Sequence, residues 1–341
     1  MSAWAAPETL HVPIDHHSAV QTAADRAREL ARACRMSGAL PDRAAVLASE
    51  LASNISKHAR NGALFLQQSP GGTAFSEVAL DIVAVDNGPG IPDIGLSLTD
   101  GFSTTRTMGA GLGAVRRIAS DLTLRSAAGR GTLAHARLAA PGGARPLADI
   151  GALCLPADGQ QTCGDAYAVV EDDEGLTGLV VDGLGHGPDA AAASRRAVRT
   201  FLARPDAPLP EVFDALHSAL RHTRGAAAAA VRIGAGRAEY CGVGNIRAAA
   251  LSPHGITQQF TGQAGIVGYN LPAPRSRCLD MSDHTGLVLY TDGIDHRWTR
   301  DPDPAELSLP PTLLAASLAH THRRRRDDAT VLAVGSPLGI G

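Results

Sequence analysis

The stretch Val180-Val-Asp-Gly-Leu-Gly-His-Gly187 decides the fold of the second half of this 341-residue chain. An apolar run ends there in an acidic residue, and glycine then occupies every second position before Pro188 follows. Glycine at this density indicates that the backbone closely approaches an ion or a ligand. The pattern predicts a strand over 176–182 that turns into a helix over about 187–203, because proline favours the first helical position.

Other acidic residues stand at the ends of further predicted strands in this half. They are Asp165, Asp292 in the motif Thr291-Asp-Gly293, and the pair Asp327-Asp328. An Asp-Gly pair is often only a turn, and for Asp292 alone that explanation is the better one. Together with Asp182, carboxylates without histidine or cysteine neighbours favour hard cations such as Mg²⁺ or Mn²⁺. Two such cations could lower the pKa of a shared water and direct it at the phosphorus of a phosphoester.

This ordered set of motifs resembles the PPM-type metal-dependent serine/threonine phosphatases, in the SpoIIE/RsbX branch, over about residues 148–336. Tyr240-Cys-Gly-Val-Gly-Asn245 and Gly265-Ile-Val-Gly268 match the same branch. The resemblance implies an αββα sandwich that binds two Mn²⁺ or Mg²⁺ ions, with Asp182 as the catalytic carboxylate between them. The other implied ligands are Asp165, the Gly183 carbonyl, Asp292 and Asp327. Asp328 then supports these ligands from behind, and His186 and Asn245 have a lesser role in orienting glycines or substrate.

A second set of polar residues lies in the first half of the chain. Glu50, Asn54 and His58 share one face of a helix predicted over about 41–59, beside an apolar stripe that faces a core. A polar row of this kind can be a solvated helix edge. That explanation is weaker for Asn54, because asparagine is a poor residue for a helix interior. An amide oxygen there can hold Mg²⁺, and a carboxylate one turn earlier can orient or deprotonate a hydroxyl group.

Two glycine motifs follow this helix. Asp86-Asn-Gly-Pro-Gly90 ends a strand predicted over 78–85, and its composition is also that of an ordinary turn. Gly109-Ala-Gly-Leu-Gly113 opens a helix predicted over about 112–121, where free backbone amides favour phosphate oxygens. Either motif alone is a weak signal. In a functional site, Asp86 could accept a hydrogen bond from the exocyclic amine of a base, while the glycines let the backbone approach the ring.

The order of these motifs, with Gly129-Arg-Gly-Thr132 on a closing hairpin, resembles the GHKL ATP-binding fold over about residues 10–139. Ser49-Glu-Leu-Ala-Ser-Asn54 and Gly101-Phe-Ser-Thr-Thr105 match the small serine kinases of the RsbT type, which phosphorylate STAS-domain proteins. The resemblance implies a Bergerat α/β sandwich that binds ATP and Mg²⁺, with Glu50 as catalytic base and Asn54 as Mg²⁺ ligand. It places Asp86, Gly88, Gly90 and Thr132 at the adenine, and Gly109, Gly111 and Gly113 at the triphosphate.

Length and composition fit two soluble α+β domains. We expect a kinase domain over 10–140, a linker over 141–147 that contains Pro141-Gly-Gly-Ala-Arg-Pro146, and a phosphatase domain over 148–337. A net charge of −3 gives no electrostatic reason to expect nucleic acid or an anionic membrane as partner. The five cysteines form no CxxC pair, and neither a signal peptide nor a membrane span is evident, so we expect a cytoplasmic location.

The two resemblances together predict a bifunctional regulator of bacterial partner switching. The kinase domain would phosphorylate a serine or threonine of a STAS-domain protein, an anti-sigma-antagonist-like or stressosome component, and the phosphatase domain would remove the phosphate. A sigma factor or another switch protein is a further possible partner. Three alternatives stay open: a phosphatase gated by a domain that senses ATP without transferring phosphate, an anti-sigma binding module, and a hydrolase for a small phosphorylated metabolite.

Overall fold

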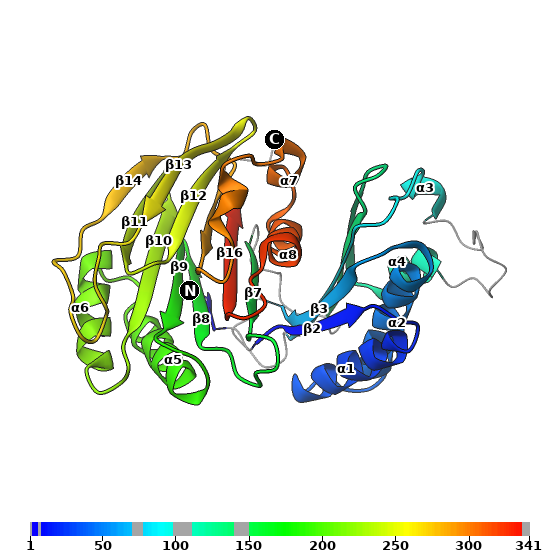
Figure 1. Cartoon of the computed structure of the whole chain (residues 1–341), viewed down its shortest axis with the longest axis horizontal. Helices are drawn as coiled ribbons and strands as arrows, with labels where there is room; N and C mark the ends of the chain where they lie inside the picture. The colour runs from blue at the N-terminus through cyan, green and yellow to red at the C-terminus, as the bar shows by residue number, and fades with distance from the viewer. Residues whose placement is uncertain (1, 6–7, 70–77, 98–110, 140–149, 336–341) are drawn as a thin grey trace. The chain divides into compact units, whose positions relative to one another are not determined.

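The computed structural model of the chain describes residues 2–5, 8–69, 78–97, 111–139 and 150–335, the first range by its backbone alone (Figure 1). The chain forms two compact units. One comprises Thr9–Pro146, which we call the inserted unit. The other combines Met1–Glu8 with Leu147–Gly341, and we call it the terminal unit because it takes residues from both ends of the chain. The linker predicted over 141–147 lies outside the described residues.

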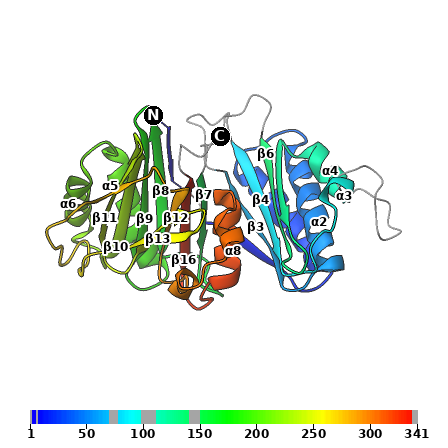
Figure 2. The same cartoon turned by 90° about the horizontal axis from the view of Figure 1, so that it is seen from above.

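The inserted unit contains one antiparallel sheet in the order β2-β3-β4-β6-β5. Its strands are β2 (Leu10–Ile14), β3 (Gly62–Gln68), β4 (Ala79–Asp86), β5 (Asp121–Ser126) and β6 (Thr132–Ala139). Its helices are α1 (Ala19–Ala33), α2 (Leu40–His58), the single turn α3 (Ile94–Ser97) and α4 (Gly111–Ile118). The α1 and α2 helices pack against each other, α2 lies against β3, β4 and β6, and α4 lies against β5 and β6 (Figure 2).

The helices of the inserted unit form because small apolar residues recur at helical spacing. Ala23, Ala27 and Ala31 of α1 are fully buried, and Leu47 and Leu51 of α2 belong to the same hydrophobic core. Alanine and leucine are strong helix formers, and alanine side chains let the two helices approach closely. This packing fixes α2, and it therefore fixes the two polar residues, one turn apart, that the sequence analysis assigned to an ATP site.

The terminal unit contains two antiparallel sheets, in the orders β1-β8-β9-β10-β11-β14 and β13-β12-β15-β16-β7. The strands are β1 (Ser2–Ala5), β7 (Ile150–Leu155), β8 (Asp165–Asp172), β9 (Gly175–Gly183), β10 (Ala226–Gly234), β11 (Arg237–Val243), β12 (Arg247–Ser252), β13 (Gly255–Thr261), β14 (Arg277–Asp280), β15 (Gly286–Tyr290) and β16 (Ala329–Gly335). The helical segments are α5 (Pro188–Ala203), α6 (Leu209–Leu220), the 3₁₀ turn η2 (His296–Thr299), α7 (Pro304–Leu307) and α8 (Pro311–His322).

The layers of the terminal unit follow from which faces of the sheets are apolar. Val169 and Val180 of the six-stranded sheet meet Leu289 and Leu332 of the five-stranded sheet in one buried core. The opposite face of the six-stranded sheet packs on α5 and α6, and α8 covers β7 and β16 (Figure 1). The result is the αββα sandwich expected from the sequence, and the α+β fold class is confirmed for the chain.

The first strand of the chain belongs to the terminal unit. Strand β1 pairs antiparallel with β8 at the edge of the six-stranded sheet, with Ser2 opposite Glu171 and Ala5 opposite Ala168 (Figure 2). Residues 1–9 lie outside both of the domains predicted from the sequence. The pairing joins segments more than 160 positions apart, and the hydrophobic pattern of either segment gives no hint of its partner.

Several elements differ from those expected. Helix α1 ends at Ala33, because Arg35 has a φ of 59°, a left-handed conformation that a helix cannot continue. The helix expected to reach residue 121 ends at Ile118, since Asp121 already begins β5. Strands β2, β3, β7, β13 and β14 were not expected. Among the helices in the described part of the chain, none combines the length and hydropathy that a bilayer crossing requires.

Candidate functional site

The acidic residues of the terminal unit gather where four strands begin or end. Asp165 opens β8, and Asp182 stands directly opposite it near the end of β9. Asp292 follows β15 by two residues, and Asp327 precedes β16 by two. Carboxylates that are far apart in the sequence therefore lie at one edge of the sandwich.

Asn245 joins two of these carboxylates. Its Nδ2 donates to Oδ2 of Asp292 at 2.8 Å and to Oδ2 of Asp182 at 3.4 Å. It ends the motif Tyr240-Cys-Gly-Val-Gly-Asn245, in the turn between β11 and β12. From the sequence, Asn245 was expected to have a lesser role than the aspartates, but its amide links Asp182 to Asp292. His186, expected to have the same lesser role, is exposed to solvent.

Asp328 has a role different from that of its neighbour Asp327. Its Oδ1 accepts from the Ala157 amide and its Oδ2 from the Gly164 amide, both at 2.8 Å. Asp328 is only 6% exposed, so its carboxylate is fully committed to holding two backbone segments. Asp327 is exposed, and its Oδ1 accepts from the Asp328 amide at 3.0 Å. Asp327 therefore presents a carboxylate to solvent while Asp328 fixes the loops beneath it.

Crowding changes the acidity of the cluster. Burial, with the nearby charges of Asp292, Asp327 and Asp328, raises the pKa of Asp182 to about 7, although the Asn245 amide works in the opposite direction. Burial and the adjacent Asp182 raise the pKa of Asp165 well above its usual range, against the hydrogen bond from Thr291. The pKa of Asp327 is also raised, first by desolvation and then by Asp292. Each carboxylate makes ionisation of the next unfavourable, which a bound cation would relieve.

The donor set fits a hard divalent cation. The available groups are carboxylate and carbonyl oxygens, the ligands that Mg²⁺ and Mn²⁺ prefer. Within the described ranges, no three His, Cys, Asp or Glu side chains already surround one common point at metal-binding distance. The structure thus brings the expected ligands to one edge and links them in pairs. It does not test the coordination of each one, including the Gly183 carbonyl, and that assignment stays a prediction.

The glycines of the acidic turn have a packing role. A Cβ on Gly183 would lie 2.4 Å from the Ala190 carbonyl oxygen and 2.7 Å from the Ser194 hydroxyl, both on α5. Gly185 and Gly187 have φ values of 91° and 77°, which favour glycine. Close contact between the turn and helix α5 therefore explains Gly183, in addition to any approach of an ion.

Two further residues at this edge were missed from the sequence. Thr291 donates through Oγ1 to Oδ2 of Asp165 at 2.8 Å, and the same oxygen accepts from the Thr330 amide at 2.9 Å. Ser194 of α5, which is fully buried, donates to the Gly164 carbonyl. Thr291 belongs to a motif that the sequence analysis quoted, so attention to its hydroxyl could have found it. In the sequence, Ser194 is only one small residue in an alanine-rich helix, so no local pattern indicates its role.

The inserted unit brings Glu50 to the start of α4. The Glu50 carboxylate accepts a hydrogen bond from the Gly111 amide, and burial raises its pKa while Lys57 and this amide lower it. One turn along α2, Nδ2 of Asn54 is buried and finds no hydrogen-bond partner within the described part of the chain. A buried amide without a partner is costly, which makes Asn54 the best candidate in this unit for binding a ligand.

Asp86 lies at the end of β4, opposite Thr132 of β6. Its Oδ1 accepts from the Gly88 amide at 2.7 Å and from the Thr132 amide at 3.2 Å. Burial raises its pKa, and these two hydrogen bonds lower it. One Asp86 oxygen thus holds the turn in shape. The expected contact with an adenine amine stays a prediction.

The other predicted ATP-site glycines are explained in part by packing. A Cβ on Gly88 would lie 2.8 Å from the Ala59 side chain, and one on Gly90 would lie 2.2 Å from the Ala127 carbonyl oxygen. Gly111 and Gly113 belong to the first turn of α4, as a phosphate-binding helix start requires. Gly109 and the motif Gly101-Phe-Ser-Thr-Thr105 lie outside the described residues.

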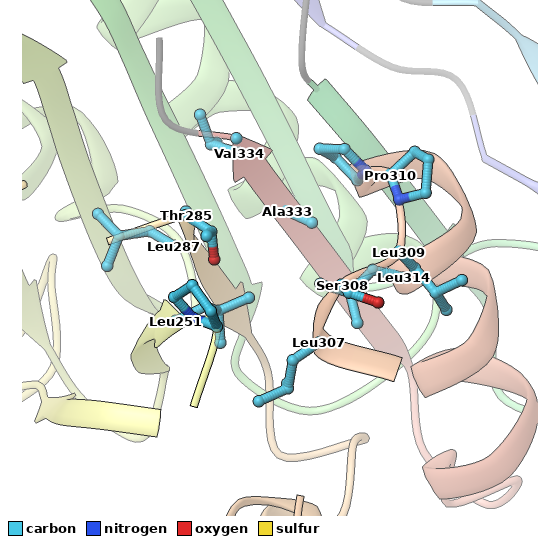
Figure 3. Close-up of a pocket in the computed structure, with 14 residues that line it drawn as sticks. Leu251, Thr285, Leu287, Leu307, Ser308, Leu309, Pro310, Leu314, Ala333 and Val334 are labelled. Atoms are coloured by element: carbon cyan, nitrogen blue, oxygen red, sulfur yellow. The ribbon is translucent and has the colours of Figure 1, made fainter. Parts of the chain in front are cut away.

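A separate groove of about 440 Å³ lies at the other end of the five-stranded sheet (Figure 3). Leu251, Leu287, Leu307, Leu314 and Val334 line it, with Thr285 and Ser308 as its polar side chains. No acidic, basic or histidine side chain is among its lining residues. It lies at the ends of β15 and β16 opposite to those that carry the acidic cluster. Its composition makes it unsuitable for phosphoester chemistry.

The second half of the chain is similar to known phosphatases. The profile of the family described as Stage II sporulation protein E (SpoIIE) matches residues 172–336. Phosphoserine phosphatase RsbX of Bacillus subtilis (strain 168) is 25% identical over 146 residues, which are 41% of this chain and 72% of RsbX. A solved structure described as "The bacterial stressosome: a modular system that has been adapted to control secondary messenger signaling" is 30% identical, with a TM-score of 0.50. The similarity covers 54% of this chain and 98% of that one.

The first half of the chain has a different relative. Serine/threonine-protein kinase RsbT of Bacillus subtilis (strain 168) is 44% identical over 84 residues, or 25% of this chain. The matched stretch spans 61% of that kinase, less than two thirds of its length. One chain is therefore similar to a protein kinase and to a phosphoserine phosphatase.

Proposed function

We propose a function from the premise that the second half of this chain belongs to the SpoIIE family of PPM-type serine/threonine phosphatases. The terminal unit hydrolyses phosphoserine or phosphothreonine on a partner protein, using the acidic cluster at the edge of its sandwich. One observation carries this proposal. Asp165 and Asp182 stand opposite each other at the edge where Asn245 ties Asp182 to Asp292.

The residues at this edge have separable tasks. Asp165, Asp182, Asp292 and Asp327 offer oxygens to two Mn²⁺ or Mg²⁺ ions, which when bound supply an activated water and neutralise the phosphate. Thr291 fixes the orientation of the Asp165 carboxylate through its 2.8 Å hydrogen bond. Asp328 holds the backbone beneath the cluster, so the ligands are positioned before any ion arrives.

The test compares two substitutions in one hairpin. Asp182→Asn removes a carboxylate from the cluster, whereas Asp173→Asn alters an exposed residue in the turn at the other end of the same hairpin. We expect Asp182→Asn to reduce Mn²⁺-dependent dephosphorylation of a phosphoserine protein by more than about 100-fold, because loss of a supporting contact alone costs 10–100-fold. ATP binding should be unchanged. Full activity in Asp182→Asn would remove this residue from the site.

The inserted unit carries the opposing reaction in this proposal. It transfers the γ-phosphate of ATP to a serine or threonine, with Asn54 holding Mg²⁺ and Glu50 orienting the attacking hydroxyl. The support is the buried Nδ2 of Asn54, a donor without a partner that a phosphate oxygen would satisfy, one turn from a carboxylate held by the Gly111 amide at the start of α4. The substrate of both units is a STAS-domain protein of a partner-switching or stressosome system.

Labelled ATP distinguishes transfer from sensing. Asn54→Ala should abolish transfer to the STAS protein, and Glu50→Gln should abolish transfer while ATP still binds. Glu29→Gln, on an exposed position of α1, is the matched control. If the wild-type chain binds ATP but never labels a STAS protein, the inserted unit is a sensor that gates the phosphatase. A sigma factor captured equally by wild type and Glu50→Gln would instead indicate an anti-sigma binding module.

A further inference from the structure

The N-terminal arm, which we define as strand β1 (Ser2–Ala5) together with Glu8, reaches the acidic cluster. Its strand β1 pairs with β8, the strand that Asp165 opens. Beyond β1, Oε1 of Glu8 accepts a hydrogen bond from the Cys163 amide at 2.9 Å. Cys163 is 3% exposed and stands two residues before Asp165. A side chain from the start of the chain thus holds the backbone that leads into the cluster.

The peptide after Cys163 is fixed from several other directions. The Gly164 amide donates to Oδ2 of Asp328 at 2.8 Å. The Gly164 carbonyl accepts from the Gly183 amide at 3.2 Å and from the Ser194 hydroxyl. Gly164 therefore links the first strand of the cluster to the acidic turn, to α5 and to the loop before β16. Glu8 completes this arrangement by satisfying the amide just before it.

We propose that Glu8 is a positioning residue for the metal-dependent centre, an inference that rests on the proposed phosphatase function. Its carboxylate holds the Cys163 amide, and this contact sets the path of the chain into Asp165. Ligand carboxylates must be held to within about 0.5 Å for tight metal binding, so freedom at Cys163 weakens binding at Asp165. Without Glu8, the amide of the buried Cys163 also loses its acceptor, and the backbone there shifts to recover a hydrogen bond.

A purely structural anchor predicts different behaviour. If Glu8 only fastens β1 to the sheet, its loss lowers the melting temperature and leaves the affinity for metal unchanged. If Glu8 positions the cluster, metal affinity falls while turnover at saturating metal is retained. The conservative replacement separates charge from geometry, because glutamine keeps an oxygen acceptor of the same reach.

The experiment uses the full-length chain stripped with EDTA. Mn²⁺ binding is measured by isothermal titration calorimetry for wild type, Glu8→Ala, Glu8→Gln and the control Glu174→Ala, which alters an exposed glutamate in the turn between β8 and β9. In parallel, the Mn²⁺ dependence of p-nitrophenyl phosphate hydrolysis gives half-saturation and kcat separately. We expect about tenfold weaker Mn²⁺ binding in Glu8→Ala, with recovery in Glu8→Gln and no change in Glu174→Ala.

The possible outcomes distinguish a failure of the Glu8 proposal from a failure of the proposed phosphatase function. Wild-type protein that binds no Mn²⁺ overturns the metal centre itself. Wild-type binding with equal affinity in folded Glu8→Ala overturns the role of Glu8 alone. If Glu8→Ala does not fold, hydrogen exchange in the wild-type chain decides, because the proposal requires a protected Cys163 amide. Rapid exchange at that amide counts against the contact.

Discussion

Thr291 shows how a hydroxyl outside the expected ligand set can govern a carboxylate within it. Its Oγ1 donates to Asp165 and accepts from the Thr330 amide, so it joins two sheets of the sandwich at the cluster. Thr291→Val keeps the shape but loses both hydrogen bonds. We expect about tenfold weaker Mn²⁺ binding and a loss of about 1–3 kcal/mol in the free energy of unfolding. Calorimetry and urea unfolding measure the two effects.

Thr291→Ser is the matched control for that prediction. Serine retains the hydroxyl and should restore most of the metal affinity, although the lost methyl group will cost some stability. Equal metal affinity in Thr291→Val and wild type would show that Asp165 needs no help from this hydroxyl.

The raised pKa of Asp182 predicts how the metal-free protein responds to pH. In the unfolded chain an aspartate titrates near 4, whereas in the folded chain Asp182 titrates at about 7. The folded state therefore binds the proton more tightly, and this stabilisation is complete below about pH 4 and is lost as the pH rises to about 7. EDTA-treated protein should melt at a temperature lower by at least about 3 °C at pH 8 than at pH 5.

Metal and mutation provide two checks on that result. Saturating Mn²⁺ should remove most of the difference between the two pH values, because the cation neutralises the carboxylates. Asp182→Asn should flatten the pH response of the metal-free protein. An identical pH response in Asp182→Asn would mean that other groups cause the effect.

At the scale of elements, the long periodic segments were predictable and the short or mixed ones were not. The α2, α5 and α8 helices and strands β9, β10 and β16 follow from apolar periodicity and from their proline or glycine boundaries. β2 has Pro13 near its middle, which is tolerated because β2 is an edge strand. β14 is short and mostly exposed, so it lacks an apolar pattern. These strands exist because a neighbour pairs with them.

In the candidate site, too, some residues were predictable from the sequence and others were not. The aspartates were predictable because each stands beside the end of an apolar strand, and Asp165, Asp182 and Asp292 also have a glycine next to them. The contacts of Thr291, Ser194 and Glu8 were not, because each depends on a hydrogen bond across 30 or more positions of sequence. A local pattern can indicate that a residue is polar, but not which distant amide it will meet.

The inserted unit contains a buried ionic cluster between strands β4 and β6. This cluster takes no part in the proposed ATP site. Asp81 of β4 accepts from Nε2 of His135 and Nε of Arg137, both at 2.8 Å and both on β6. Burial alone would raise the pKa of Asp81, but these two partners together hold it well below its usual range. Asp81→Asn leaves buried partners uncompensated. We expect it to lower the free energy of unfolding by about 3–5 kcal/mol.

The sign of the pH dependence follows from the lowered pKa. Asp81 stabilises the folded state above its unfolded pKa near 4, and that contribution is lost as the pH falls below this value. Urea unfolding between pH 3 and 6 should therefore show a steep acid loss in wild type and a shallower one in Asp81→Asn. Asp15→Asn, at an exposed position of the same unit, should follow wild type. Equal slopes in all three proteins would contradict this role.

At the scale of the whole molecule, the order of segments along the chain determines how the two units are covalently connected. The terminal unit begins with β1, is interrupted by the inserted unit, and resumes after residue 146. Two domains fused end to end would be joined at one point, whereas here both ends of the inserted unit continue into the terminal unit. A conformational change within the inserted unit is thus covalently connected to both the Glu8 side and the β7 side of the sandwich.

Strand β1 has a practical consequence for anyone who tries to separate the two units. An engineered protease site between Pro141 and Pro146 breaks one of the two covalent connections, but the arm keeps its backbone hydrogen bonds to β8. We expect the nicked pieces to co-elute on gel filtration in buffer and to part in urea. In a recombinant fragment that starts at residue 147, β8 would become an exposed edge strand of its sheet. An exposed edge strand favours self-association. Supplying residues 1–8 as a free peptide should restore its solubility.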